Sequence, residues 1–286
     1  MKPADYLRLF ALAAIWGASF LFVRLSVGAL GAVWLTELRV GIAALAMLGY
    51  ALALGIRLDW RRHWRAYMIM GLGNSALPWL LYAWAGHHLN ASTMAILNAT
   101  TPFYGAICAA IWLGEPLDAR KIAGLALGLV GVTLVVGLGS IALTSGVLLG
   151  ALACITATLC YALTTTWLKK QGQGVAALPL TAASLLVATL TLAPFLPAVP
   201  PAAAFTPAVI ASVLGIALLC SALAFLLYFR LIAEVGPTRT LTVTFLIPVF
   251  GVLWGRLFLG EPLGLGTLAG GALVLAATAL VTARRS

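Results

Sequence analysis

The five-residue segment LGEPL occurs twice in this chain, at residues 113–117 and again at residues 259–263. The second copy lies 146 residues after the first. With the same shift and no gap, identical residues that precede each copy also match: Ser75 with Ser221, Tyr82 with Tyr228, Pro102 with Pro248 and Gly105 with Gly251. Matches so far apart at one fixed shift indicate an internal repeat.

Each LGEPL segment has the pattern of a connection between two helices. Glycine commonly ends a helix, and proline is tolerated in the first turn of the next helix, where its missing N–H is not needed. Glu115 and Glu261 are therefore predicted to lie at helix turns and not to contact a transported solute.

The composition is that of a membrane protein. Of 286 residues, 63% are hydrophobic and 8% are charged, whereas a soluble globular protein carries about 25% charged residues. The net charge of +10 comes from small basic clusters between apolar runs, and no continuous basic stripe suggests a nucleic-acid partner. The expected surroundings are a lipid bilayer.

Ten apolar runs are long enough to cross a bilayer, which requires roughly 20 residues. Basic residues favour the cytoplasmic side. With a cytoplasmic N-terminus, fourteen of the seventeen Lys and Arg fall at cytoplasmic ends, and only Arg24, Arg39 and Arg256 fall at external ends. Both termini are therefore predicted to be cytoplasmic. The predicted spans are residues 7–27, 33–54, 66–85, 91–113, 122–140, 146–168, 175–196, 208–231, 237–259 and 264–282.

The repeat divides these spans into two groups of five. An odd number of spans reverses the direction in which the second copy enters the membrane, so the halves are predicted to be inverted. We expect an all-α polytopic membrane protein, with one five-helix repeat over residues 1–141 and a second over residues 142–286. Inverted repeats are typical of secondary transporters.

Four stretches carry a resemblance to a known family: AIWGASFLFVR at residues 14–24, LRVGIAAL at 38–45, NATTPFYGAICAAIWLGEP at 98–116 and IPVFGVLWGRLFLGEP at 247–262. In these the chain resembles the EamA-type ten-helix exporters of the drug/metabolite transporter superfamily, and among them the YddG-type bacterial aromatic amino acid exporters. The resemblance implies export of amino acids, other metabolites or drugs by alternating access, in a bacterial inner membrane. One departure is that Tyr161 and Ala162 lie near the place where the first half has Trp16 and Gly17.

Polar and aromatic residues inside the spans form stripes at helical spacing, and polar groups at this depth tend to face a cavity or another helix. Together they predict a cavity with aromatic walls and uncharged polar groups, suited to a solute with an apolar or aromatic side chain and a small polar end. The competing interpretation is that these side chains only fill space between helices. The candidate substrate-binding residues are Trp16, Asn74, Ser75, Trp79, Tyr82, Asn98, Thr101, Tyr161, Ser221, Phe225, Tyr228 and Thr244.

Three prolines inside spans are candidate hinges, namely Pro78, Pro102 and Pro248. Each removes a backbone hydrogen bond where a helix can bend, although static kinks are the alternative. Tyr82 and Tyr228 are predicted to lie toward opposite membrane faces and to help close opposite mouths of the cavity.

The acidic residues all fall at predicted termini, loops or helix ends, so no proton carrier is evident, and facilitated or exchange transport is expected. Arg39 is expected to pair with an acid at a helix end, with attraction of a substrate carboxylate as the alternative. No metal or cofactor is expected, because the four cysteines Cys108, Cys154, Cys160 and Cys220 have no metal-type spacing.

Other functions stay open with less support. A multidrug or other metabolite efflux carrier fits the same cavity. A membrane-embedded enzyme would need a carboxylate cluster, a His-rich metal set or a nucleophile with its base, and a channel would need a charged ring or filter loop; neither pattern is present. Small-residue pairs on the fifth and tenth spans, Gly124 with Gly128 and Gly266 with Gly270, indicate close helix packing, within a monomer or a homodimer.

Overall fold

The chain folds into helices alone over the part that the computed structural model describes, which comprises residues 2–139, 141–171, 174–203 and 205–282. An α-helix satisfies its backbone hydrogen bonds internally, as the hydrocarbon of a bilayer requires. The first half contains α1 (Pro3–Ala53), α2 (Trp60–Met70), the π-helix η1 (Gly71–Ala76), α3 (Leu77–Ala85), α4 (Ala91–Asn98), α5 (Thr101–Leu113) and α6 (Ala119–Gly137). The second half contains α7 (Ser145–Gln171), α8 (Ala177–Leu192), the 3₁₀-helix η2 (Ala193–Ala198), α9 (Pro207–Leu214), the π-helix η3 (Gly215–Leu223), α10 (Ala224–Val235), α11 (Pro237–Thr240), α12 (Val243–Leu259) and α13 (Leu265–Thr282).

The predicted class, an all-α polytopic membrane protein, is confirmed. Within the described residues, seven helical segments are long and apolar enough to cross a membrane. One of them, α1, contains the first two predicted spans, which meet at Gly31, where φ is 71°. The third predicted span, over α2, η1 and α3, and the shorter apolar helix α12 lie outside those seven. The count of ten spans stays a prediction.

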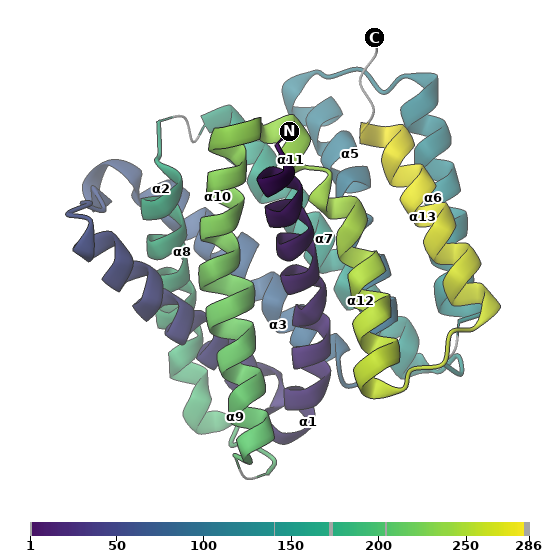
Figure 1. Ribbon diagram of the computed structural model, residues 1–286, viewed down its shortest axis with the longest axis horizontal. Helices are drawn as coiled ribbons and strands as arrows, with labels where there is room; N and C mark the ends of the chain where they lie inside the picture. The colour runs from purple at the N-terminus through teal and green to yellow at the C-terminus, as the bar shows by residue number, and fades with distance from the viewer. Residues whose placement is uncertain (1, 140, 172–173, 204, 283–286) are drawn as a thin grey trace.

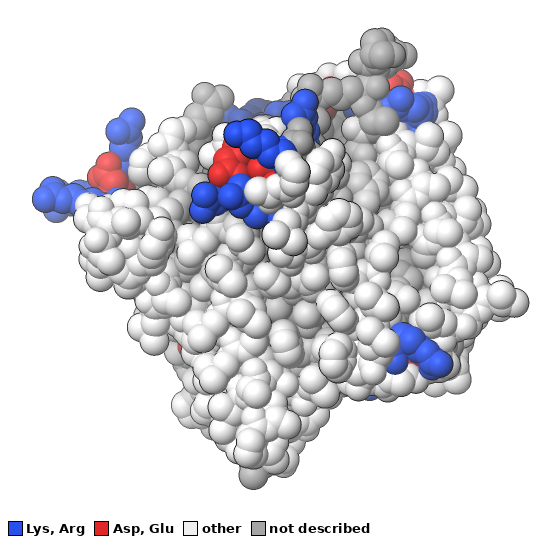
Figure 2. All heavy atoms as spheres, in the orientation of Figure 1, with Lys and Arg blue, Asp and Glu red and all other residues white. Residues whose placement is uncertain are grey.

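Charge is concentrated at one end of the bundle. The start of α1 and the end of α13 lie at the same end, which we call the terminal end, and the opposite end is the far end (Figure 1). On the face that Figure 2 shows, most Lys and Arg lie toward the terminal end, and the broad middle of the molecule is almost free of charge. An uncharged belt of this kind suits the hydrocarbon core of a bilayer.

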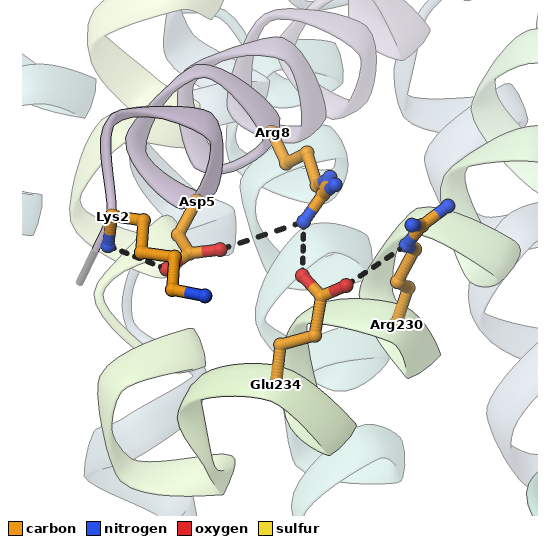
Figure 3. A network of polar contacts seen from close by, with 5 residues as sticks. All are labelled: Lys2, Asp5, Arg8, Arg230 and Glu234. Carbon is orange, nitrogen blue, oxygen red and sulfur yellow. Dashed lines mark hydrogen bonds and ion pairs between the residues drawn. The ribbon is translucent and has the colours of Figure 1, made fainter.

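An ion network joins α1 to α10 at the terminal end (Figure 3). The backbone N–H of Lys2 donates to the carboxylate of Asp5 at 2.7 Å, and Arg8 lies 3.4 Å from the same carboxylate. Arg8 also pairs with Glu234, which accepts a second hydrogen bond from Arg230 at 3.0 Å. The charged ends of two distant segments are thereby held together outside the apolar belt.

Both halves contain a π-helix at matching places. The repeat shift of 146 residues carries η1 onto part of η3, and the matched residues Ser75 and Ser221 lie inside the two π segments. At Gly71 there is no room for a side chain, because a Cβ would lie 2.6 Å from Val187 and 2.8 Å from the carbonyl oxygen of Ser184. At Gly215 a Cβ would lie 2.8 Å from the Phe22 ring, which would have to shift. π-helical turns are rare and occur frequently at functional sites.

The two LGEPL segments end their helices in the same way. Gly114 closes α5 and Gly260 closes α12, with φ values of 68° and 64° that favour glycine.

The glutamates that follow these glycines have different partners. Glu261 is buried and accepts hydrogen bonds from the backbone N–H of Ala91 at 2.7 Å, and from the N–H and hydroxyl of Ser92 at 3.0 and 2.6 Å. It therefore caps the start of α4. Glu115 instead forms a solvent-exposed ion pair with Lys169 at 2.7 Å.

Helices α6 and α13 pack closely through glycines. A Cβ on Gly270 would lie 2.6 Å from the carbonyl oxygen of Gly131, and one on Gly131 would lie 2.9 Å from the carbonyl oxygen of Gly270. A Cβ on Gly124 would contact α13 near Val281, and one on Gly266 would contact α6 near Leu138. These small residues therefore hold two helices of the same chain together. Monomer or homodimer stays a prediction.

We expect Glu261→Ala to destabilise the protein by about 1 to 3 kcal/mol, since it leaves buried N–H groups without an acceptor. The matched change Glu115→Ala is expected to cost at most about 1 kcal/mol, because solvent screens an exposed ion pair. The hydrogen bond from Lys169 lowers the pKa of Glu115. The contribution of this ion pair to the free energy of unfolding is therefore present at neutral pH and is lost as the pH falls through the lowered pKa. Thermal unfolding in detergent measures both variants, and equal losses of stability would contradict the different roles of the two glutamates.

Gly270→Ala is expected to destabilise the contact of α6 with α13 by about 1 to 3 kcal/mol, since the added methyl group meets backbone atoms of the other helix. Gly49→Ala is the matched control, because a Cβ at Gly49 meets no atom within 4 Å and alanine favours a helix. Detergent melting curves compare the two variants; an unchanged melting temperature for Gly270→Ala would refute the close packing.

Candidate functional site

One cavity lies between the two halves of the bundle, with a volume of about 880 Å³. Its wall includes ten of the twelve predicted substrate-binding residues, contributed by helices from both halves. These are Trp16, Asn74, Trp79, Tyr82, Asn98, Thr101, Tyr161, Phe225, Tyr228 and Thr244. The volume lies within the range of roughly 300 to 1,000 Å³ found for small-molecule sites.

The cavity extends toward the terminal end. Leu241 and Thr242, between α11 and α12, line it, as does Thr282 at the end of α13. At the far end, by contrast, Glu261 ties the connection between α12 and α13 to the start of α4. The two ends of the cavity therefore differ: helices of both halves are joined beyond one end, and the cavity reaches the helix ends at the other.

Tyr82, on α3, lines the cavity and is buried. Its hydroxyl donates to Oδ1 of Asn98 at 3.1 Å. The ring meets Phe20 edge to face with centroids 5.6 Å apart, and stacks with Tyr161 at 6.4 Å. These contacts link α3, α4, α1 and α7 around the buried Tyr82.

A second aromatic group lies on α1 and α10. The ring of Trp16 is 5.3 Å from that of Tyr228 and 6.3 Å, edge to face, from that of Phe225. Tyr228 is only partly buried, unlike its repeat mate Tyr82. The repeat-related tyrosines thus occupy different surroundings in this conformation.

The polar side chains of the wall have mostly local partners. Thr101 and Thr244 donate to carbonyl oxygens three residues back, those of Asn98 at 2.7 Å and Leu241 at 2.8 Å. Such bonds satisfy carbonyl groups where helices begin or break. Asn74 accepts a long hydrogen bond of 3.5 Å from Thr164. The amide groups of Asn74 and Asn98 retain donors for a solute.

Ser75 and Ser221 are buried but do not line the cavity. Both lie in π-helices, and the wider π turn changes the spacing at which side chains share a face. The stripes derived from regular helical spacing therefore do not apply there. The hydroxyl of Ser221 donates to the carbonyl of Ile216, five residues back, at 3.0 Å.

The three candidate hinge prolines have different positions. Pro102 lines the cavity in the first turn of α5, directly after the break between α4 and α5. Pro78 lies in the first turn of α3, after η1, and is not part of the wall. Pro248 lies inside α12, whose nearest break is at Leu241 and Thr242. Bending at each of these places stays a prediction.

Arg39 corrects the expectation of an uncharged cavity. It lies on α1, is 9% exposed and belongs to the cavity wall. It forms no ion pair with a carboxylate of the described residues, contrary to the expected pairing with an acid. The signal was present in the sequence, because a charge well inside an apolar span is costly. The prediction differs because it places Arg39 at a helix end.

Glu37 corrects the view that every acidic residue lies at a helix end. It lies within α1 and is 8% exposed, with Oε2 buried and without a hydrogen-bond partner. Oε1 of Glu37 lies beside Gly41, and Thr189 of α8 lies beside the same glycine. The Glu37 carboxylate therefore lies on the side of α1 that faces α8. Glu37 is not part of the cavity wall.

Comparisons with known proteins agree with this architecture. The chain is 26% identical to an uncharacterized transporter, YvbV, of Bacillus subtilis over 285 residues, which covers 99% of this chain and 93% of that protein. It is 27% identical to a probable terminal-alkyne amino-acid exporter of Streptantibioticus cattleyicolor, with 94% of this chain and 90% of that protein covered. A crystal structure with 19% sequence identity superposes with a TM-score of 0.67, covering 98% of this chain and 96% of that one, and so shares the fold.

The sequence model of the EamA-like transporter family matches this chain twice, over residues 5–137 and 148–283. The two matches together span nearly the whole sequence. The relatives named above are transporters as well, which agrees with the expectation that the chain is not an enzyme. This protein is a membrane transporter and belongs to the EamA-like transporter family.

Proposed function

We propose that this protein is a secondary transporter that exports small metabolites by alternating access through the central cavity, with aromatic and other apolar amino acids as its favoured substrates. It works in a bacterial inner membrane, with ten spans in two inverted repeats, residues 1–141 and 142–286, and with both termini in the cytoplasm. The observation that carries the proposal is that the cavity reaches the helix ends at the terminal end, whereas Glu261 joins helices of the two halves beyond the far end.

The difference between the two ends is what one state of an alternating-access cycle requires. The cavity reaches the terminal end beside Leu241 and Thr242, while Tyr82 is buried against Asn98 and Glu261 joins helices of the two halves beyond the far end. In the proposed orientation, this state accepts a solute from the cytoplasm. A second state with the roles of the two mouths exchanged would then release it outside.

The cavity wall supports an amino acid with an apolar side chain. Trp16, Phe225 and Tyr228 form a cluster of aromatic rings against which an apolar side chain can pack. Asn74 and Asn98 offer uncharged donors and acceptors for polar groups. The name of the Streptantibioticus cattleyicolor relative, an amino-acid exporter, favours the same substrate class.

Purified protein in liposomes is expected to show saturable counterflow of phenylalanine, tryptophan or leucine, because a carrier exchanges solute across one binding site. Radiolabelled uptake into liposomes preloaded with the unlabelled amino acid measures this, and liposomes without protein are the control. Transport of cationic dyes with no movement of amino acids would replace this proposal with drug efflux, whereas flux that never saturates would indicate a channel.

Tyr82→Ala and Tyr228→Ala are each expected to slow counterflow about fivefold to tenfold. The reason is that the lost ring contacts, and at Tyr82 also the lost buried hydrogen bond to Asn98, cost about 1 to 1.5 kcal/mol in the closed state of one mouth. Tyr50→Ala is the matched control, because Tyr50 is exposed on the outer surface of α1, away from the cavity. If both cavity variants exchanged solute as fast as the control, closure by these tyrosines would be refuted.

A further inference from the structure

Arg39 is a buried charge held in a fixed position. Its guanidinium carbon lies 3.6 Å from the centroid of the Trp79 ring, in a cation–π contact. Its Nε donates to the hydroxyl of Ser221 at 3.1 Å. Contacts with α3 and η3 therefore fix one face and one edge of the guanidinium, although both neighbours are uncharged.

The rest of the guanidinium has no protein partner. Among the described residues, none accepts a hydrogen bond from Nη1 or Nη2, and no carboxylate lies within ion-pair distance of Arg39. Because these two nitrogens are not among the buried unpartnered atoms and the residue belongs to the cavity wall, their donors are accessible from the cavity. A buried charge normally has a counter-charge or a hydrogen-bonding partner for each donor. Here both are missing on the cavity side.

We propose that the carboxylate of the transported solute supplies the missing counter-charge, so that Arg39 selects solutes carrying a carboxylate. A guanidinium presents parallel N–H donors in a planar fork that matches the two oxygens of a carboxylate. This inference rests on the proposed function and names the group by which that site recognises its substrate.

The charge count favours a solute with a single anionic group at this point. Arg39 is the one Lys or Arg in the cavity wall among the described residues, and the wall contains no Asp or Glu. One guanidinium balances one carboxylate, whereas a doubly charged phosphate would keep an uncompensated negative charge in an apolar cavity. The aromatic cluster of Trp16, Phe225 and Tyr228 lines the same cavity and can hold the apolar part of the solute.

The same charge works against cationic solutes. A cation without a carboxylate would meet the guanidinium as a like charge, with no acidic group of the wall to offset the repulsion. This sets the substrate class apart from the cationic dyes and drugs that an apolar cavity of this size would otherwise hold. For a zwitterionic amino acid whose carboxylate binds at Arg39, the amide oxygens of Asn74 and Asn98 in the same cavity wall are the candidate acceptors for the ammonium group.

The test compares two probes with the same ring, phenylalanine and phenylalaninamide, which lacks the carboxylate. Both are measured by saturable uptake into liposomes containing the purified protein, and by the rise in melting temperature that each probe causes in detergent. The unaltered protein is expected to prefer phenylalanine. Arg39→Gln is expected to weaken the apparent affinity for phenylalanine about tenfold to a hundredfold, the usual effect of losing a charge-assisted hydrogen-bonded pair. The amide is expected to bind at least as well as before, because its ammonium group no longer meets a like charge.

Two further variants separate recognition from folding. Arg39→Lys keeps the charge but loses the planar fork, so its affinity for phenylalanine is expected to lie between those of the unaltered protein and Arg39→Gln. Arg62→Gln is the matched control, because Arg62 is an exposed arginine of α2 outside the cavity; it is expected to bind both probes like the unaltered protein. A purely structural role for Arg39 would weaken both probes equally.

Three results would overturn the inference. The first is an equal loss of affinity for both probes in Arg39→Gln, and the second is an unchanged affinity for phenylalanine. The third is equal preference of the unaltered protein for acid and amide, which leaves the proposed export function in place but removes the carboxylate requirement. If the unaltered protein moved and bound neither probe, the proposed function would fall, and the inference with it.

Discussion

The absence of water in the hydrocarbon core of a bilayer determines how this protein can be built. Every backbone group and every charge at that depth must find its partner within the protein or in a bound solute. Continuous helices meet the requirement directly, but a chain that moves a solute also needs helices with breaks. At the break between α4 and α5, the hydroxyls of Thr100 and Thr101 donate to the carbonyls of Leu97 and Asn98 at 2.7 Å. At the start of α4, the carboxylate of Glu261 takes the place of water.

Glu261 accepts hydrogen bonds from the first N–H groups of α4, and this contact also makes the two halves differ in this conformation. Glu261 crosses from the end of α12 to the first half, whereas its repeat mate Glu115 lies at the surface with Lys169. Tyr82 and Tyr228 differ in the same sense, since the first is buried against Asn98 and the second is partly exposed. Two similar sequences thus have unequal contacts, and the cavity reaches the helix ends at the terminal end only beside residues of the second half, Leu241, Thr242 and Thr282. In the proposed arrangement of two inverted copies, exchanging these contacts between the copies is the simplest route to the opposite opening.

Most of the fold followed from composition and spacing, because a chain with 63% hydrophobic residues has few ways to avoid water. Ten of the twelve candidate residues line the cavity, since polar and aromatic stripes at regular helical spacing mark buried faces. The two exceptions, Ser75 and Ser221, lie in π-helices, which have no reliable sequence pattern and alter that spacing. Arg39 differs from its prediction for another reason. The predicted span begins at residue 33, which places Arg39 near its end, whereas in the structure the helix that follows the non-helical Gly31 continues to Ala53.

The two charges within this part of α1 show why a solute, and not the protein, is the natural partner of Arg39. Residues two apart on a helix point to different sides, so Glu37 cannot approach the guanidinium of Arg39. Glu37 lies toward Gly41 and Thr189 of α8, whereas Arg39 lies against Trp79 and Ser221 at the cavity. An acid placed one turn away on the same face would have neutralised the arginine permanently and filled its donors. The spacing in this sequence keeps the charge of Arg39 available, in a cavity whose wall otherwise attracts apolar groups.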